Sequence, residues 1–212
     1  MSASAPRVLH LVWNLIRGGT EGQCARVVMA LRDAGHEHRV AVFRREGFFV
    51  RAVEERCGPL HLLPIHHVLR PLTLGLVRDL ARRLRSERVD LVHAWDADAE
   101  VFGSWAARWA GVPWITSRRD LGEIYAGWKL SLMNHADRGA RAVVVNASAI
   151  ARRVEANGVP RDRVVLIPNI LDVAEFDQLA ARPFPRAAEL GPGRWIGLVA
   201  RLDPEKDVAT FL

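Results

Sequence analysis

The chain has 212 residues, of which 50% are hydrophobic and 25% are charged, as in an ordinary globular protein with a core of its own. No apolar run reaches the ~20 residues that cross a bilayer, and Met1–Pro6 lacks the features of a secretion signal, so we expect a cytoplasmic protein. The formal net charge of +6 suits a phosphorylated small molecule or an anionic membrane surface. The sequence shows no helix-turn-helix, zinc-finger or RNA-binding motif, which argues against a nucleic-acid partner.

Short apolar runs alternate along the chain with longer amphipathic stretches. The expected strands are Arg7–Trp13, Arg39–Phe43, Leu60–Leu63, Asp90–Ala94, Trp114–Thr116, Ala142–Val145 and Val164–Ile167. The expected helices are Glu21–Ala34, Phe49–Cys57, Leu72–Arg85, Ala97–Ala110, Tyr125–Arg138 and Ser148–Asn157. Thr20 is a candidate N-cap of the first helix, and Asn146 or Ser148 of the last. This alternation predicts an α/β fold, a Rossmann-like doubly wound parallel sheet with helices on both faces.

The last part of the chain has a different composition. Residues 182–194 are rich in Pro, Gly and Ala and predict a linker. After it, Trp195–Ala200 has the apolar pattern of a new buried strand, and Pro204–Leu212 that of an opening helix. We therefore expect an N-terminal domain at 1–181, a linker at 182–194, and the first strand and helix of a second domain at 195–212.

Ligands of open parallel sheets bind beyond the carboxyl ends of the strands, so the loops that follow the strands form the candidate site. The first such loop is Gly18-Gly19-Thr20-Glu21-Gly22. Paired glycines at the start of a helix suit an approaching anion, and a tight turn that needs positive φ explains them equally well. The loop matches neither the P-loop nor the dinucleotide fingerprint.

Polar residues also follow the fourth, fifth and seventh expected strands. His93 is either a ligand-facing or a structural residue, and Asp96 is either a ligand group or a helix cap. Ser117-Arg118-Arg119-Asp120 places two arginines where they suit a phosphate or carboxylate, or else form an exposed salt-bridged turn. Asn169 lies in a turn that asparagine favours for local hydrogen bonding.

Two other kinds of site are less compatible with the sequence. His66-His67 has no Cys, Asp or Glu at ligand spacing, so no metal site is expected. Arg44 and Arg45 follow the second strand, where an NAD-binding protein carries an acid, and they suit the 2′-phosphate of NADP instead. An NADP-dependent oxidoreductase is therefore an alternative, which the missing glycine fingerprint disfavours.

In their order and spacing, these segments resemble the family-4 glycosyltransferases, which have the two-domain GT-B fold. The resemblance begins with a strand and a Gly-Gly-x-Glu loop, includes an Asp-hydrophobic-Val-His strand, and ends with an Arg-Leu-x-x-x-Lys run. The segments that carry it are Val8–Gly22, Asp90–Trp95, Ala106–Ile115, Ser117–Asp120, Val143–Ser148, Gly158–Asp172 and Gly197–Lys206.

The resemblance implies that the chain is the N-terminal, acceptor-side half of a retaining glycosyltransferase, followed by the start of its donor-binding half. Such an enzyme transfers a sugar from a nucleotide-sugar donor to a hydroxyl of a sugar or lipid-linked acceptor, in polysaccharide or glycolipid biosynthesis, with no metal or cofactor. It implies His93 and Asp120 as catalytic residues. The residues that it implies for substrate binding are Gly18, Gly19, Glu21, Trp95, Asp96, Arg118, Arg119, Asn169, Arg201 and Lys206. Arg201 and Lys206 would offset the charge of the leaving diphosphate.

Three positions depart from the family pattern. Trp95 stands where many relatives carry a second histidine, Ile170 replaces the glycine of a Pro-Asn-Gly turn, and Asp207 replaces the glycine after the lysine. The family's paired glutamates of the donor domain are absent from the chain, so we expect it to be inactive alone. The alternative is a non-catalytic GT-B-like binding module that needs a separate partner chain, with an exposed apolar face near Phe176–Pro185.

The expected helix Leu72–Arg85 has a strongly basic face made of Arg78, Arg82, Arg83 and Arg85. This face is compatible with peripheral contact with anionic lipid at the inner face of the membrane, although a solvated helix face is the preferred interpretation.

Overall fold

The computed structural model describes residues 6–65, 71–183, 189, 191–200, 202 and 207–211. They form two compact units, one ending at Ile170 and the other beginning at Leu171, and each is described by itself. The first unit ends ahead of the boundary at 181 that the sequence suggests. The expected linker and the expected start of a second domain stay predictions.

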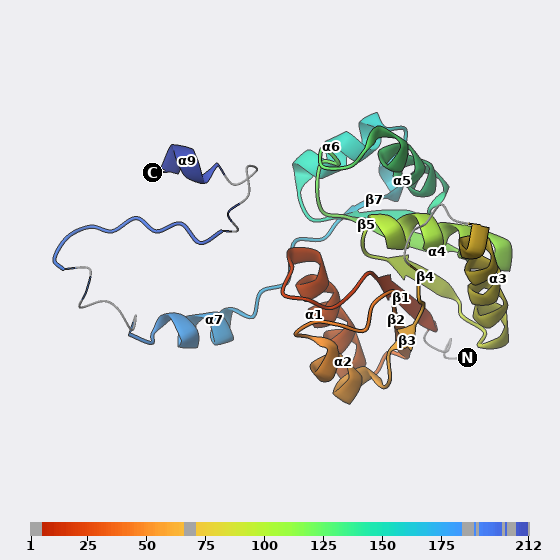
Figure 1. Ribbon diagram of the computed structural model, residues 1–212, viewed down its shortest axis with the longest axis horizontal. Coiled ribbons are helices and arrows are strands. Elements are labelled where there is room, and N and C mark those ends of the chain that lie inside the picture. Colours follow the sequence, from red (N-terminus) through yellow and green to blue (C-terminus); the bar gives the residue numbers. More distant parts are fainter. Residues whose placement is uncertain are drawn as a thin grey trace. The chain divides into compact units, whose positions relative to one another are not determined.

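A parallel sheet of seven strands forms the centre of the first unit (Figure 1). The strands are β1 (Val8–Val12), β2 (His38–Val42), β3 (His61–Leu62), β4 (Leu91–Ala94), β5 (Trp114–Arg118), β6 (Ala142–Val145) and β7 (Val164–Leu166). Their order is β3-β2-β1-β4-β5-β6-β7. This order confirms the doubly wound sheet. Successive strands are added toward one edge up to β3 and toward the other edge from β4 on, so the switch point lies between β1 and β4, where such sheets bind ligands.

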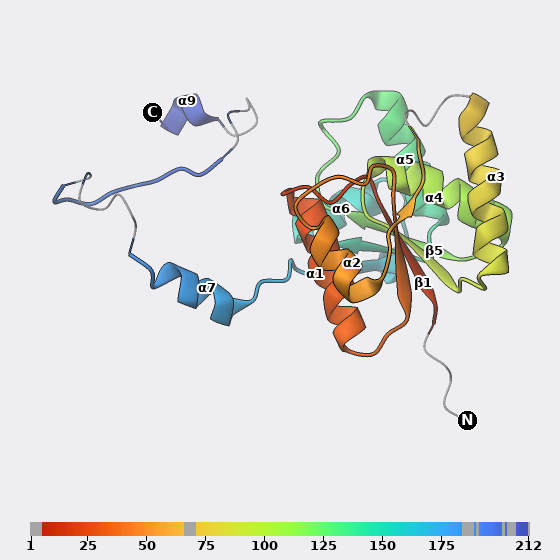
Figure 2. The ribbon, with the colours of Figure 1, turned by 60° about the horizontal axis from the view of Figure 1, so that its bottom comes forward.

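Helices cover both faces of this sheet. Those of the first unit are α1 (Gly19–Asp33), α2 (Val50–Cys57), α3 (Pro71–Ser86), α4 (Ala97–Ala110), α5 (Gly127–Gly139) and α6 (Ser148–Ala156), with a 3-10 turn, η1 (Arg161–Arg163). Right-handed crossovers place α1 and α2 on one face and the later helices on the other. Figure 2 shows α1 and α2 side by side, with α3 and α4 on the far side of the strands.

The apolar side chains of the strands divide between these two faces. Leu9 and Leu11 of β1 pack with α3 and α4, and Val12 packs with α1 and α2. Alternate residues of a strand point to opposite faces, so a strand with helices on both faces is apolar almost throughout. His10 is the polar exception within β1, and it lies on the α1 side together with Trp95.

The loop after β1 is held by the loop after β2. The Leu15 N–H donates to Glu46 O at 3.0 Å, and the Phe49 N–H donates to Leu15 O at 2.9 Å. Gly47 lies between these two partners of Leu15 and has a φ of 123°. A Cβ at this position would lie 2.2 Å from the Leu15 carbonyl. Only glycine fits such a positive φ and such a close approach. The start of α1 is thereby fixed next to the sheet.

Two helix starts differ from the sequence expectation. The N-cap of α1 is Gly18 rather than Thr20, and the N-cap of α6 is Ala147 rather than Asn146 or Ser148. Neither cap makes a side-chain hydrogen bond to the helix. The side chain of Asn146 is directed to Asn169, to whose Oδ1 its Nδ2 donates at 3.2 Å.

The second unit contains α7 (Val173–Ala180) and α9 (Val208–Phe211). The Asp172 carboxylate caps α7 by accepting the Glu175 N–H at 3.0 Å. Residues Trp195–Ala200 have no strand conformation in this structure, and the strand expected there stays a prediction. A strand forms only by pairing with a neighbour, and no described residue pairs with this segment. Among the described residues, no helix has both the length and the apolar character needed to span a membrane.

Candidate functional site

The carboxylate of Asp96 joins the ends of β1 and β4. Asp96 Oδ2 accepts the Trp13 N–H at 2.5 Å, and Oδ1 accepts the N–H groups of Asp98 and Ala99 at 3.1 and 3.0 Å. Asp96 is therefore the N-cap of α4, the second of the two roles open to it from the sequence. Burial raises its pKa to about 6, although the hydrogen bonds to the backbone act in the opposite direction.

The glycine loop lies at the start of α1, beyond the carboxyl end of β1. Neither Gly18 nor Gly19 has positive φ, which rules out the tight-turn explanation for these glycines. Gly18 is extended, and a Cβ there would lie 2.0 Å from Glu21 Oε2. Nothing lies within 4 Å of a Cβ at Gly19. The Glu21 carboxylate thus covers Gly18 at the helix N-terminus, where an anion is favoured by the helix dipole.

His93 and Trp95 form a buried aromatic pair at the end of β4. Their ring centroids are 4.3 Å apart, and His93 Nε2 lies 2.8 Å from Ser117 Oγ at the end of β5. Burial lowers the pKa of His93 to about 3, so its imidazole is neutral at physiological pH. His93 is only 7% exposed, which places it beneath the surface of the site rather than in contact with solvent.

Three polar side chains connect the ends of β5, β6 and β7. Arg119 Nη1 donates to Asn169 Oδ1 at 2.7 Å, and Asn146 Nδ2 donates to the same oxygen at 3.2 Å. The Arg119 guanidinium also lies over the Trp95 indole, with Cζ 4.8 Å from the ring centroid. Arg119 Nε and Asn146 Oδ1 are buried and have no hydrogen-bond partner. This Arg119–Asn169–Asn146 bridge gathers the polar groups that the sequence places at separate strand ends.

Arg118 points into the core, although its neighbour Arg119 lies at the site. Its Nη1 lies 3.6 Å from carboxylate oxygens of both Glu100 on α4 and Asp137 on α5, and all three side chains are about 1–2% exposed. Asp137 also accepts the Thr116 hydroxyl at 2.6 Å. Neither the exposed turn nor the phosphate contact expected for Arg118 fits this burial. Alternation along β5 turns the two arginines to opposite faces.

Asp120 uses both carboxylate oxygens within the loop between β5 and α5. Oδ1 accepts the Gly122 N–H at 2.8 Å, and Oδ2 accepts the Tyr125 hydroxyl at 3.0 Å. Burial and the Asp120 carboxylate together raise the pKa of Tyr125, which keeps its hydroxyl protonated as a donor. Asp120 therefore shapes this loop, and its expected catalytic role stays a prediction.

Gln23 is a site residue that the sequence reasoning missed. Its Nε2 donates to Ile170 O at 2.9 Å, and its Oε1 accepts the Ile170 N–H at 2.7 Å. These two hydrogen bonds tie the turn after β7 to α1. Ile170 does not have positive φ, so its replacement of glycine causes no backbone strain. A polar residue on the buried face of an amphipathic helix is the sequence signal that could have revealed Gln23.

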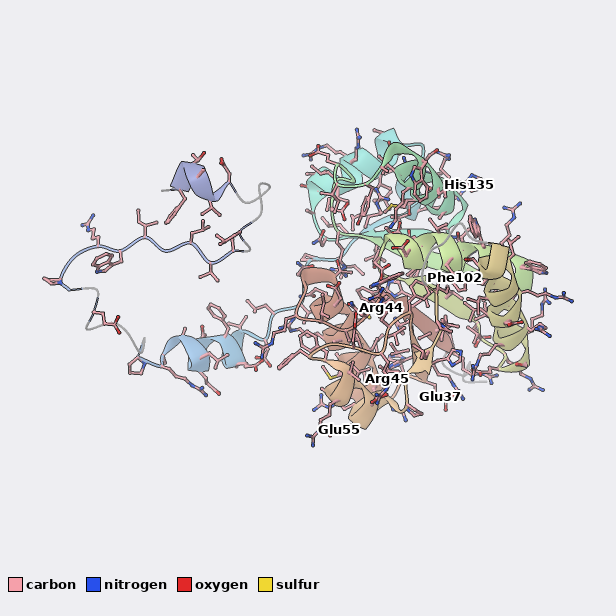
Figure 3. The ribbon with its side chains drawn as sticks, in the orientation of Figure 1. Glu37, Arg44, Arg45, Glu55, Phe102 and His135 are labelled. Carbon is pink, nitrogen blue, oxygen red and sulfur yellow. The ribbon has the colours of Figure 1, made fainter. Side chains whose placement is uncertain are left out.

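Arg44 and Arg45 follow the end of β2, and Arg45 lies beside α2 (Figure 3). Arg45 Nε and Nη2 donate to the two Glu54 oxygens at 2.9 and 2.6 Å, and Arg44 lies 3.9 Å from Glu46. Because the Glu54 carboxylate already accepts two hydrogen bonds from Arg45, that guanidinium offers little to a 2′-phosphate. This observation weakens the NADP alternative.

A hollow of about 800 Å³ lies at the opposite, amino edge of the sheet. It is bordered by the starts of β1 and β2 and by the ends of α1 and α3, and Arg7, Arg32 and Arg39 are among its lining residues. It contains none of the site residues expected from the sequence.

The structure thus brings together Gly18, Trp95, Asp96, Arg119 and Asn169 at the carboxyl ends of the strands. His66, His67, Arg201 and Lys206 lie outside the described residues. Asp207 has a φ of 46°, the left-handed conformation for which the family pattern has glycine. Among the described residues, no group of three or more His, Cys, Asp or Glu side chains could hold a metal ion.

The sequence profile of Glycosyltransferase Family 4 matches residues 17–175. The chain belongs to glycosyltransferase family 4. The match includes the glycine loop, the end of β4 and the Arg119–Asn169–Asn146 bridge. It therefore confirms the resemblance inferred from the motifs. A comparison with curated proteins finds no match.

Solved structures share the fold of this family-4 chain. HepE from Anabaena, crystallised with UDP and glucose, has a TM-score of 0.65 and 20% identity over 82% of this chain and 50% of that one. A glycosyltransferase from Rickettsia africae has a TM-score of 0.65 and 17% identity over 89% and 48% of the two chains. UDP-N-acetylglucosamine 2-epimerase from Rickettsia bellii has a TM-score of 0.58 and 13% identity over 84% and 52%.

The family-4 chain spans about half the length of these structures. At such identities the likeness establishes the fold, one half of a GT-B protein. Because an epimerase has the same fold, the fold by itself does not determine the reaction.

Proposed function

We propose that this family-4 chain supplies the acceptor-side half of a retaining glycosyltransferase. In the reaction, the bond between the anomeric carbon of the sugar and the diphosphate oxygen breaks, and a bond to an acceptor hydroxyl oxygen forms. The nucleotide leaves with its diphosphate, and the acceptor hydroxyl loses its proton. The observation that carries this proposal is the cluster of Gly18, Trp95, Arg119 and Asn169 at the switch point of a family-4 chain.

The charges and dipoles of this edge suit a diphosphate. The N-terminus of α1 directs free backbone N–H groups beyond the end of β1, and Gly19 leaves open space beside them. Arg119 adds a guanidinium that can donate two parallel hydrogen bonds to phosphate. HepE, with which the chain shares its fold, was crystallised with UDP and with UDP-glucose. These observations support a nucleotide-sugar donor, with a sugar or lipid-linked hydroxyl as acceptor.

The reaction needs a second domain that closes over the donor. Transition-state stabilisation depends on groups from both sides of a cleft, and the residues proposed here come from one side. We infer that the chain binds a nucleotide weakly and does not turn over by itself. Arg201 and Lys206, proposed to balance the diphosphate charge, belong with that second side. The domain boundaries at 181 and 194 are part of the same proposal.

Calorimetric titration of the chain with UDP, GDP and their common sugar conjugates tests the proposal. Weak binding of one nucleotide series, lost in Arg119→Met and retained in a variant of the exposed Arg108, is the expected result. If a folded chain binds none of these compounds, the acceptor-side assignment loses its support. Retention is tested by the anomeric configuration of the product, read by proton NMR in a preparation that turns over.

A non-catalytic binding module is the second candidate, and one feature of the second unit favours it. Helix α7 exposes Val173, Phe176 and Leu179, whose spacing places them on one side of the helix. A partner chain that covers this apolar stripe would support the module. Light scattering with a candidate partner, compared with a Phe176→Ser variant, distinguishes the two functions.

Peripheral contact with anionic lipid also stays a proposal. On α3, Arg82 pairs with Asp79, Arg83 pairs with Glu87, and Arg85 donates to backbone oxygens at the end of α4. These intramolecular partners favour the solvated-face alternative. Co-sedimentation with phosphatidylserine vesicles tests this contact. Equal co-sedimentation of the wild-type chain and of an Arg78→Glu, Arg82→Glu, Arg83→Glu variant would exclude it.

A further inference from the structure

Three histidines lie in a row beneath α1, on neighbouring strands of the sheet. His10 of β1 lies at the centre, with its ring centroid 5.3 Å from that of His38 on β2 and 5.2 Å from that of His93 on β4. His10 and His93 are register partners. All three are buried, and His10 is only 1% exposed. An imidazole in a strand interior loses its hydration, so its position needs a specific hydrogen bond as compensation.

His10 makes that hydrogen bond to Trp95. The indole Nε1–H of Trp95 donates to His10 Nδ1 at 3.1 Å. The indole nitrogen is a donor only, so Nδ1 must be the unprotonated nitrogen of the ring. Burial and the neighbouring imidazole of His93 hold the pKa of His10 well below its ordinary value, so the ring stays neutral. The tautomer with its proton on Nε2 is therefore fixed by the Trp95 contact.

Trp95 connects His10 to Arg119 at the candidate site. It is 2% exposed and packed against His93 on one side, and Arg119 lies over its ring with Cζ 4.8 Å from the centroid. Arg119 in turn donates to Asn169. A rotation of the indole would remove the aromatic surface on which the guanidinium rests, because cation–π attraction requires the cation above the ring face.

We propose that His10 is a positioning residue of the candidate site. It holds the Trp95 indole in place by a hydrogen bond, and the indole holds the Arg119 guanidinium toward the nucleotide diphosphate. The inference rests on the proposed function for the identity of the ligand. The geometric part, from His10 through Trp95 to Arg119, concerns the free chain and is measurable without a ligand.

Two variants of His10 separate hydrogen bonding from packing. His10→Leu fills much of the imidazole volume but has no acceptor, so it leaves the Trp95 N–H buried and unpaired. His10→Asn is smaller, and its Oδ1 can take the place of Nδ1 as the acceptor. If packing alone mattered, the asparagine variant would be the more disturbed of the two. The hydrogen-bond role predicts the reverse order.

The first measurement is the ¹H–¹⁵N spectrum of the free, full chain. Trp95→Phe and Arg119→Lys identify the Trp95 indole and Arg119 Nε–H resonances. We expect His10→Leu to move both resonances and His10→Asn to leave both close to their wild-type positions. His38→Leu, in the same row but without a bond to Trp95, is the matched control and should leave them unchanged. An unmoved Arg119 resonance in folded His10→Leu would overturn the proposal.

The second measurement is UDP binding by calorimetry, with thermal unfolding followed by circular dichroism on each variant. His10→Leu should weaken UDP binding by about tenfold, and His10→Asn by less than about threefold. Equal UDP affinity of wild-type protein and a folded His10→Leu variant contradicts the positioning role. If the wild-type chain binds no UDP, the proposed function fails instead, and the spectrum still decides whether His10 positions Arg119.

Discussion

The guanidinium of Arg119 lies over the indole of Trp95, with Arg119 Cζ 4.8 Å from the centre of the indole ring. The same guanidinium donates to Asn169 at 2.7 Å. One cation is thereby held by an aromatic face and an amide that come from different strand ends. A planar guanidinium can satisfy both contacts and still offer N–H groups to a phosphate.

Replacing Arg119 by lysine should weaken nucleotide binding although the charge is kept. A lysine ammonium is a point charge that cannot stack and donate in a fork at the same time. We expect UDP affinity to fall by about tenfold, or about 1.4 kcal/mol, in isothermal calorimetry. Arg108→Lys, an exposed substitution on α4, is the control. Equal UDP affinities of the wild-type chain and the Arg119→Lys variant would show that Arg119 does not bind the nucleotide.

Replacing Glu21 by glutamine should strengthen diphosphate binding. Its carboxylate covers Gly18 at the N-terminus of α1, where a phosphate is proposed to bind, and like charges repel. We expect a gain of several-fold in UDP affinity, and a loss of stability of roughly 0.3–1 kcal/mol because the helix dipole loses its anion.

Glu37→Gln changes an exposed acid ahead of β2, at the other edge of the sheet, and serves as the matched control for Glu21. Titrations at two salt concentrations show whether any gain is electrostatic, because salt screens interactions between exposed charges. Weaker UDP binding by Glu21→Gln would mean that Glu21 contacts the substrate directly, as the family resemblance implies.

Replacing Arg118 by methionine should destabilise the fold and leave nucleotide affinity unchanged. The substitution leaves Glu100 and Asp137 buried without their cation, and breaking a buried ion pair costs about 3–5 kcal/mol. Denaturant unfolding measures this loss. Arg51→Met breaks a solvent-exposed pair with Glu55 and should change stability far less than Arg118→Met does. A folded Arg118→Met variant with impaired UDP binding would restore the substrate-binding role.

Acidification should destabilise the chain through His93. Its pKa in the fold is about 3, and an unfolded histidine titrates near 6.5, so between these values the unfolded chain binds the additional proton. Stability from this group is complete above about pH 6.5 and decreases by about 1.4 kcal/mol per pH unit as the pH falls toward 3. Asp96 acts in the opposite direction, because its raised pKa favours the protonated fold and this contribution is lost as the pH rises through about 6.

The difference between wild-type protein and His93→Asn isolates the histidine, since Asp96 is present in both. Denaturant unfolding at several pH values should give curves that converge as the pH falls from 6.5. His135→Asn, a substitution on the exposed side of α5, is the matched control. Parallel curves for the wild-type protein and the His93 variant would mean that the fold does not lower the pKa of His93.

Much of the fold follows from local patterns. Buried parallel strands are short apolar runs, and β4 and β6 occur where such runs predict them. Helix α4 has the expected bounds, and it begins at the Asp96 cap and ends at Gly111, which has positive φ. These features depend on residues near in sequence. Helix caps were less predictable, because Thr20 and Asn146 have the correct chemistry, but the caps in the structure are Gly18 and Ala147.

The candidate site was predictable as a set of loops but not as a geometry. The rule for parallel sheets names the carboxyl ends of the strands, which selects Gly18, Asp96, Arg119 and Asn169. It does not say that Arg118 turns into the core or that Asp96 caps a helix. Nor does it reveal His10 or Gln23, whose partners Trp95 and Ile170 are distant in sequence.

The sequence by itself determined the alternation of strands and helices, the family and the strand ends that meet at one edge. These follow from hydrophobic periodicity and from motifs whose residues are neighbours in the chain. Only the tertiary structure decided which of two adjacent arginines is a core ion and which rests on Trp95. That choice depends on the face of β5 to which each side chain points and on the helices packed against that face, because a guanidinium is stable in the core only beside Glu100 and Asp137.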